Sequence, residues 1–392
     1  MRNKAFSLAP VSLLLGLIFS GPAWANFESD LGYLRSAFQL AGFDNSKLEP
    51  FLNPHHGASQ FRLSAQDAPW AGNYFPMNKG GIANRWADPQ ANKGAKSKEQ
   101  WNQLPDPNTL TQEQINRLSP AEKYDLWIGD KDFSVTNHEL NYRGPRRATP
   151  VKGWEGFCNG VRCAGINLPE PTFPITVKNP NGIEITFQPA DLKALAGASY
   201  FYVENYAQIG APSAKGTAER QPNPAIFDLA LRVYLAENKK AFVIDSNLGP
   251  EIWNESVIGY KRTVNRAIIS SFWNRFKDPR IDSVVRVKVE LETLGEISIE
   301  ASNKPTKDSV AAGKLMKPTP LSYLLYLDKN GRAIDGVWEG STKVRGVDFA
   351  WFGTGRGTDG DLAEGTRNPH LKFDKVRTLF LDASASLCSR VF

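Results

Sequence analysis

The sequence contains few of the residues that build disulfide scaffolds and metal sites. It has three cysteines and four histidines among 392 residues. At most one disulfide can form within the chain, and no cysteine or histidine pattern has the spacing of a zinc site. No segment beyond residue 25 has the length and hydrophobicity of a transmembrane helix, so we expect no membrane insertion. We also expect neither a cofactor nor a bound metal.

Neither sign of charge dominates the chain. Two of the 47 basic residues, Arg2 and Lys4, lie in a segment that we expect to be removed, which leaves 45 against 41 acidic residues. The basic residues are scattered, apart from Arg143, Arg146 and Arg147. This weak and dispersed excess gives no support for nucleic-acid binding.

The first 25 residues have the pattern of an export signal. A basic start precedes an apolar run over residues 11–19, which is too short to span a membrane. Ala23, Trp24 and Ala25 then form a small-x-small cleavage site. We expect the mature chain to begin at Asn26 and to be periplasmic or extracellular.

The mature chain is large enough to bury a substantial core. Ten tryptophans and 22 phenylalanines favour a packed globular protein, whereas 26 prolines and 32 glycines predict long loops. We divide it into a loop-rich N-terminal region, residues 26–150, and a catalytic core with a C-terminal antiparallel sheet, residues 151–392.

Local patterns predict an α+β fold. Residues 31–43 are amphipathic, and residues 109–127 carry a helix signal in which Ser119, Pro120 and Glu122 form an N-terminal cap. A helix is expected from Cys158 or Asn159, a hairpin over 175–187, and a helix over 224–236 that leads into a strand at 241–245. Residues 285–291 alternate cleanly, and the segments 321–327 and 333–338 flank a turn at 328–331, so we expect antiparallel strands there. The glycine-rich segment 353–361 is interpreted as a surface loop, with calcium binding as a weaker alternative.

Cys158 is the candidate nucleophile. It lies in the glycine-rich stretch GWEGFCNGVRCAG, residues 153–165. A thiolate at a helix N-terminus is a better nucleophile than an ordinary thiol, and Gly156 and Gly160 would let the backbone approach the sulfur. The amide of Cys158 could donate to an oxyanion. The alternative is an inert thiol in the core.

The two neighbouring cysteines are poorly placed for a disulfide. Five residues separate Cys158 from Cys163, so on a helix their side chains diverge. We expect Cys158 to be free, and Cys163 either to pair with Cys388 or to stay buried and reduced.

Several segments resemble the transglutaminase elicitor family, in that family's order and over most of the mature chain. They are DAPWAGNYFPMNKGGIANRW from residue 67, LSPAEKYDL from 118, GWEGFCNG from 153, NPAIFDLAL from 223, FVID ending at 245, and EIWNESVIGYK from 251. The resemblance implies a secreted protein-glutamine gamma-glutamyltransferase with a papain-like cysteine core. Its partners would be glutamine side chains and amines of proteins or peptides.

The most specific part resembles the family's elicitor peptide. The matching residues are Trp253, Asn254, Val257, Gly259, Tyr260 and Lys261, and Ser256 replaces a proline. By the same resemblance Cys158 is the catalytic cysteine, and its surroundings are matched by Trp154, Gly156, Asn159 and Gly160.

One position departs from the family pattern. Asp228 stands where the pattern has histidine, whereas the family's acidic residue is kept as Asp245. An ordinary carboxylate is too weak a base for a thiol, and Asp228 has a possible partner in Arg232, four residues on, as an exposed helical pair. We keep Cys158, Asp245 and Asp228 as the candidate catalytic set.

The remaining histidines offer no secure base. They are His55, His56, His138 and His370, and for each one a structural or surface role is the more ordinary interpretation. Two functional classes stay open: an exported acyltransferase, with a cysteine peptidase or amidase as its variant, and a catalytically silent binding or recognition protein.

Overall fold

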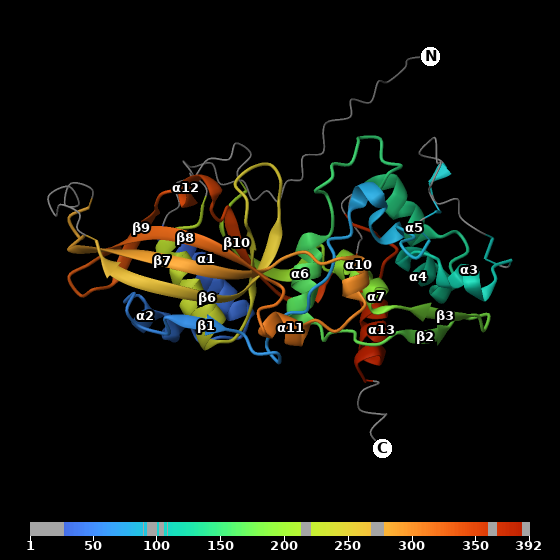
Figure 1. Cartoon of the computed structure of the whole chain (residues 1–392), viewed down its shortest axis with the longest axis horizontal. Helices are drawn as coiled ribbons and strands as arrows, with labels where there is room; N and C mark the ends of the chain where they lie inside the picture. Colours follow the sequence, from blue (N-terminus) through green and yellow to red (C-terminus); the bar gives the residue numbers. More distant parts are fainter. Residues whose placement is uncertain are drawn as a thin grey trace, which may run out of the picture.

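The chain is elongated, with a large sheet at one end and a helical lobe at the other, as Figure 1 shows. The structure is a computed structural model. It covers residues 27–88, 90–91, 100–101, 106–107, 109–212, 221–267, 278–359 and 367–385. The predicted export signal and Cys388 lie outside the described residues.

An antiparallel sheet of eight strands forms the first end of the molecule. Its strands follow the order β4-β10-β5-β6-β7-β8-β9, and β1 pairs with β6. Their bounds are β1 Gln60–Arg62, β4 Val203–Gly210, β5 Phe242–Asp245, β6 Asn254–Arg266, β7 Ser283–Leu294, β8 Met316–Leu327, β9 Ala333–Trp338 and β10 Phe349–Gly357. Strands from distant parts of the sequence therefore share one sheet.

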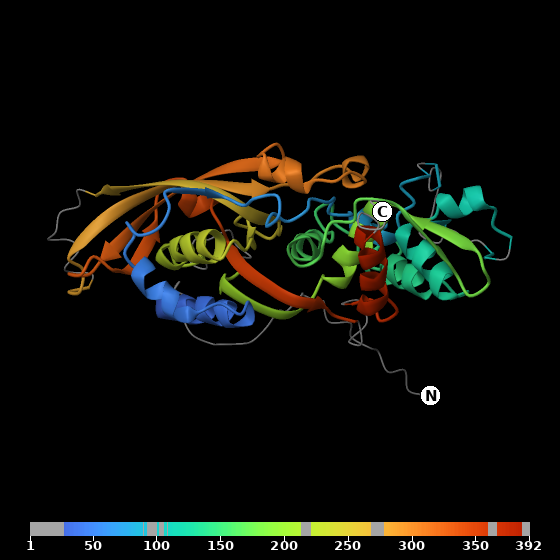
Figure 2. The same ribbon diagram turned by 90° about the horizontal axis from the view of Figure 1, so that it is seen from below.

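The first hydrophobic core lies on the concave side of this sheet. Strand β7 alternates, so that Val285, Val287 and Val289 are buried in this core. Helices α1 (Phe27–Leu40) and α8 (Pro224–Leu229) cover it, and α8 continues as a π-helical segment over Ala230–Glu237. Figure 2 shows these helices within the curve of the sheet. A short helix, α2 (Leu48–Phe51), and a 3-10 turn, Asn45–Lys47, lie beside them.

The second hydrophobic core belongs to the helical lobe. Helix α7 (Pro189–Ser199) is buried along its whole length, and α4 (Pro120–Ile128) and α13 (Phe373–Ala385) pack against it. The other elements of the lobe are 3-10 turns at Met77–Lys79 and Gly81–Ala83, α3 Gln112–Asn116, α5 Ser134–His138, a π-helical turn at Glu139–Arg143, hairpin strands β2 Ile175–Lys178 and β3 Glu184–Phe187, and α10 Ile299–Ser302. Helices α11 (Lys307–Ala311) and α12 (Thr342–Arg345) follow β7 and β9.

Helix α6 (Cys158–Asn167) lies between the sheet and the helical lobe. It contacts α7 on one side and strands β5, β6 and β10 on the other. Two glycines allow the approach to α7. A Cβ atom on Gly160 would lie 1.9 Å from the carbonyl oxygen of Gly197, and one on Gly197 would lie 2.6 Å from the Val161 side chain. Only glycine fits at Gly160 without separating the helices.

Most of the predicted elements are present. The cap at Ser119 is a complete capping box. The Ser119 hydroxyl oxygen accepts a hydrogen bond from the Glu122 amide, and the Glu122 carboxylate accepts one from the Ser119 amide. The β2–β3 hairpin pairs Ile175 with Phe187 and turns through Gly182, whose φ is +80°. The predicted strand 333–338 has the observed bounds of β9.

The prediction of a loop at 353–361 was wrong for its first half. Residues Gly353 to Gly357 belong to β10 and pair with β4. A Cβ atom on Gly353 would lie 2.7 Å from the sulfur of Cys163. Gly353 therefore reflects the close packing of helix α6 against this strand, which local sequence cannot distinguish from a turn.

Within the described residues, no helix is long and apolar enough to cross a membrane.

Replacing Gly160 with alanine should strongly destabilise the fold, because the new methyl group would overlap the Gly197 carbonyl. We expect a loss of at least about 3 kcal/mol, at the upper end for overpacking. Gly32→Ala is the matched control, since Gly32 lies in α1 with no atom within 4 Å of the added Cβ. That substitution should stabilise by about 0.5–1 kcal/mol. Urea denaturation measures both, and equal midpoints would contradict the packing argument.

Candidate active site

Cys158 is the first residue of α6, and its side chain is only 5 % exposed. Its sulfur forms hydrogen bonds with Ile252, two residues before β6, and with Asn254, the first residue of β6. The thiol donates to the carbonyl oxygen of Ile252 at 3.7 Å, and Nδ2 of Asn254 donates to the sulfur at 3.4 Å. The residue before the helix, Phe157, provides no side-chain cap. The thiol is thus enclosed between a helix N-terminus and a strand.

Burial is the main electrostatic influence on this thiol. It raises the pKa of Cys158, and the hydrogen bond from Asn254 opposes this effect without overcoming it. Glu296 raises the pKa further, whereas Arg162 lowers it. These two residues form an ion pair of 2.7 Å. The resting cysteine is therefore a protonated thiol at neutral pH.

An aromatic pair lies beside the thiol. The rings of Tyr74 and Trp253 are 5.8 Å apart, and the Phe157 amide donates to the carbonyl oxygen of Tyr74 at 2.6 Å. A Cβ atom on Gly156 would lie 2.5 Å from the Tyr74 ring. Gly156 is thus required for the approach of Tyr74 to the turn, which also contains the half-buried Trp154.

Two predicted neighbours of the sulfur have other roles. The Asn159 side chain donates to the carbonyl oxygen of Phe201 at 2.9 Å, and Gly160 faces Gly197. The expectation that Gly160 lets the backbone approach the sulfur was therefore wrong. Both residues attach α6 to the helical lobe.

Asp245 lies at the end of β5, directly opposite Asn254 in the pairing of β5 with β6. One carboxylate oxygen accepts the amides of Trp253 at 2.9 Å and Asn247 at 3.2 Å. The other oxygen is buried and has no hydrogen-bond partner among the described residues. Burial raises the pKa of Asp245 to about 7. Asp245 therefore holds the segment that contacts the thiol, and it retains a proton much more readily than an ordinary aspartate.

The elicitor-like segment is mainly strand β6. Val257 and Tyr260 are fully buried in the first core, and the Tyr260 hydroxyl donates to the carbonyl oxygen of Ala58 at 3.1 Å. A Cβ atom on Gly259 would lie 2.5 Å from the Glu292 carboxylate. Lys261 is exposed and pairs with Glu290 at 2.9 Å. Most of the segment is structural, and only its first residues, Trp253 and Asn254, contribute to the thiol site.

The comparisons with known proteins agree with this architecture. The model of the transglutaminase elicitor family matches residues 44–386. The chain belongs to the transglutaminase elicitor family. In the comparison with solved structures, the GP42 transglutaminase from Phytophthora sojae aligns with a TM-score of 0.65 and 21 % identity, over 92 % of this chain and 99 % of that one. This likeness shows a shared fold. The comparison with curated proteins gave no match.

Asp228, where the pattern of the transglutaminase elicitor family has histidine, lies in a separate ion cluster. Its carboxylate pairs with Arg232 at 2.8 Å and Arg262 at 3.1 Å, and it accepts the hydroxyl of Tyr323 at 2.6 Å. Burial alone would raise the pKa of Asp228, but the two guanidinium groups outweigh it and hold the pKa below its usual value. The expected pair with Arg232 is present, but it is buried rather than exposed.

None of the partners of Asp228 is a contact of Cys158, so the structure does not bring these two candidate residues together.

The four histidines are all described, and none contacts the sulfur of Cys158. His56 packs against Phe51, with ring centroids 4.4 Å apart, and His138 lies 4.7 Å from Tyr142. Burial lowers the pKa of His138 to about 4. No histidine is therefore placed to take the proton of Cys158.

The cysteines fit one of the two expected arrangements. Cys158 and Cys163 are both free and buried, and Asn167 donates to the Cys163 sulfur at 3.5 Å. The alternative partner of Cys163, Cys388, lies outside the described residues.

Sequence reasoning missed the residues that surround the thiol from distant segments. They are Ile252, Glu296 and Trp351. Asn254 was named for its resemblance only and not as a partner of Cys158. No local pattern marks these roles, because they arise where β6, β10 and the segment after β7 meet α6.

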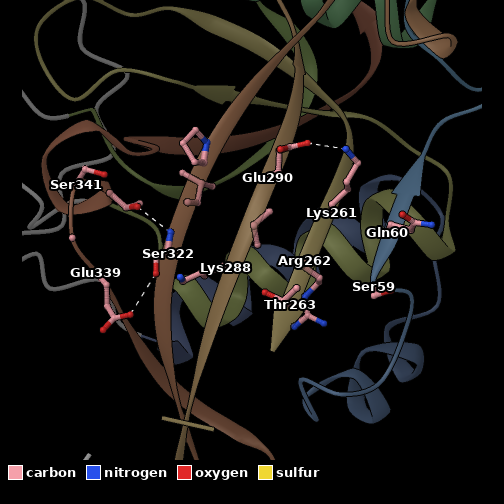
Figure 3. A pocket seen from close by; sticks show the side chains of 15 residues that line it. Ser59, Gln60, Lys261, Arg262, Thr263, Lys288, Glu290, Ser322, Glu339 and Ser341 are labelled. Atoms are coloured by element: carbon pink, nitrogen blue, oxygen red, sulfur yellow. Dashed lines mark hydrogen bonds and ion pairs between the residues drawn. The ribbon is translucent and has the colours of Figure 1, made fainter. Parts of the chain in front are cut away.

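A pocket of about 640 Å³ lies elsewhere, on the face of β6, β7 and β8 opposite the first core (Figure 3). Lys261 and Glu290 form an ion pair at its wall, and Ser322 bonds to Thr342 and Glu339. Lys288 also lines it. Cys158 does not, so this pocket is separate from the thiol site.

Replacing Asp228 with asparagine should leave two buried guanidinium groups without their anion. We expect a loss of about 3–5 kcal/mol in the free energy of unfolding at pH 7. Asp278→Asn, which breaks the exposed pair with Arg280, should cost at most about 1 kcal/mol. Urea titrations of both variants provide the comparison. A small and equal loss in the two would show that the cluster is not a structural requirement.

Asp245 should make stability depend on pH. Its carboxyl ionises near 3.8 in the unfolded chain and at about 7 in the folded one. Stability due to this group is complete below pH 3.8, is lost as the pH rises to 7, and then stays constant. As the pH rises from 4 to 8, the free energy of unfolding of Asp245→Asn should therefore increase relative to that of the wild type by roughly 4 kcal/mol. Denaturant midpoints across this range measure the gain, and a difference that is independent of pH would exclude the raised pKa.

Proposed function

We propose that the chain is an exported transglutaminase-like acyltransferase in which Cys158 is the nucleophile. The sulfur bonds to the carbon of a glutamine carboxamide, the carbon–nitrogen bond breaks, and ammonia leaves with the thiol proton. An amine then attacks the thioester, forms the new amide and returns a proton to the sulfur. The partners are glutamine and amine groups of proteins or peptides, and no cofactor takes part.

The observation that carries this proposal is the placement of Cys158. It is the first residue of a helix that packs against antiparallel strands within the family-matched region. A cysteine at such a helix end is the arrangement of a papain-like core, which we propose for this chain. The helix dipole and the Asn254 amide both favour the thiolate over the neutral thiol.

The same site limits the rate. Burial raises the pKa of Cys158, and no imidazole lies at hydrogen-bond distance to remove the proton. Asp245 is the nearest candidate for an orienting acid, because it holds the amide of Trp253, whose neighbours on both sides contact the sulfur. A slow enzyme follows, since only the small thiolate population can attack.

The lack of a histidine partner favours a second candidate function. In that case the chain is a catalytically silent member of the family that acts as a binding or recognition protein. A peptidase or amidase differs from the first proposal only in that water takes the acyl group in place of an amine.

The proposed compartment is periplasmic or extracellular. It rests on the export pattern of residues 1–25, which lie outside the described structure, and on the resemblance to a family of secreted proteins.

Amine incorporation distinguishes the two candidates. The wild type should attach a labelled primary amine to a glutamine-rich protein slowly, and Cys158→Ala should lose all of this activity because no thioester can form. Cys163→Ala is the matched control, since Cys163 is also a buried free thiol but lies outside the site. Incorporation that persists in Cys158→Ala would exclude the mechanism. Incorporation that is absent from the wild type would support the silent candidate.

A further inference from the structure

The carboxamide of Asn254 is fixed between the thiol and an indole. Its Oδ1 accepts the Nε1 proton of Trp351 at 2.9 Å, and its Nδ2 donates to the sulfur of Cys158 at 3.4 Å. Asn254 is 4 % exposed and Trp351 is 8 % exposed. An indole can only donate a hydrogen bond, so Oδ1 must face Trp351 and the NH₂ group must face the sulfur. The indole thus decides which end of the amide the thiol meets.

The backbone of Asn254 is held equally firmly. Nε of Arg162 donates to its carbonyl oxygen at 3.3 Å, while other nitrogens of this guanidinium bond to the Gly72 and Gly295 carbonyl oxygens. Asn254 is also the residue opposite Asp245 in the sheet. The donor is therefore preorganised, since neither its backbone nor its amide has to rearrange when charge develops on the sulfur.

We infer that Asn254 is the donor that stabilises the Cys158 thiolate, and that Trp351 is a positioning residue that keeps Nδ2 of Asn254 toward the sulfur. The inference rests on the proposed function and assigns it two further residues. When the thiolate attacks, negative charge leaves the sulfur for the carbonyl oxygen, and it returns to the sulfur when the amine displaces the thioester. Asn254 stabilises the charged sulfur at both stages.

Two features of the site support this role. Among the influences on the pKa of Cys158, the Asn254 hydrogen bond is the strongest that lowers it, ahead of Arg162. No other side chain among the described residues donates to this sulfur. Without Asn254 the buried thiolate would have lost water and gained no side-chain donor, which is a costly state for a charge.

The test is the pH dependence of Cys158 alkylation by iodoacetamide in the full mature chain, followed by peptide mapping so that each thiol is read separately. Asn254→Leu keeps the size of the side chain and removes the side-chain donor, while the backbone amide at this position remains. It should slow alkylation roughly tenfold below the thiol pKa, the effect expected for a lost hydrogen bond to a charged group. Trp351→Phe releases the amide and should slow alkylation by a smaller factor of about three.

Trp338→Phe is the matched control. The Trp338 indole is also buried and donates to a backbone carbonyl, that of Pro222, at 2.9 Å. Trp338→Phe should leave the pH dependence of Cys158 alkylation unchanged, because the hydrogen bond of the Trp338 indole lies in the first core and does not involve Asn254. A shift in Trp351→Phe but not in Trp338→Phe would therefore reflect the orientation of Asn254 and not a general loss of stability.

Asn254→Asp provides a second variant if Asn254→Leu fails to fold. An aspartate can still accept the Trp351 proton but cannot donate to sulfur, and its charge also opposes the thiolate. It should shift the alkylation profile to higher pH. An unchanged profile in the folded Asn254 variants, or a shift to lower pH, would overturn the inference.

Alkylation needs no glutamine substrate, so it decides the role of Asn254 even if amine incorporation shows the protein to be catalytically silent.

Discussion

The start of strand β6 is the constraint on which the arrangement of the site depends. Asn254 joins β6 to two other elements there: its side chain bonds to Cys158 of α6 and Trp351 of β10, and its carbonyl oxygen accepts a hydrogen bond from Arg162 of α6. Asp245 of β5 holds the preceding residue through its amide. A helix at the boundary of two hydrophobic cores needs such polar contacts, because apolar packing alone does not fix its position along a sheet. The contacts that position α6 are also the contacts that enclose the thiol.

Enclosure has opposite consequences for packing and for chemistry. It excludes water from the sulfur, which favours the neutral thiol and raises the pKa of Cys158. The same exclusion strengthens any hydrogen bond to the charged sulfur, because the local dielectric constant is low. The reactivity of Cys158 is therefore a balance between the cost of burial and the strength of the hydrogen bonds from Asn254, its side chain first. An imidazolium ion would shift that balance, and none lies near the sulfur in this chain.

The parts of the fold that could be predicted are those specified by near neighbours in the sequence. Ser119 and Glu122 form their capping box within one helical turn, and strand β7 shows its alternation directly. The glycines of β10 were wrongly predicted to form a loop. Gly353 is small because its strand packs against Cys163 of helix α6, which lies far away in the sequence. The thiol site was predictable only as to Cys158, since Asn254, Trp351 and Glu296 reach it from segments about 100 to 200 residues further along the chain.

Asp228 shows how a departure from a family pattern can be misread. By itself, an aspartate in place of histidine indicates a lost base. In the structure its carboxylate neutralises two buried guanidinium groups, one on its own helix and one on β6, and it accepts a hydroxyl from β8. Arg232 was visible at four residues' distance, but Arg262 and Tyr323 were not, and they are what make the cluster a cross-link between the helix and the sheet. The charge at residue 228 is therefore explained by the stability of the first core. Whether Cys158 reacts is decided at the boundary of the two cores, by groups that are not among the partners of Asp228.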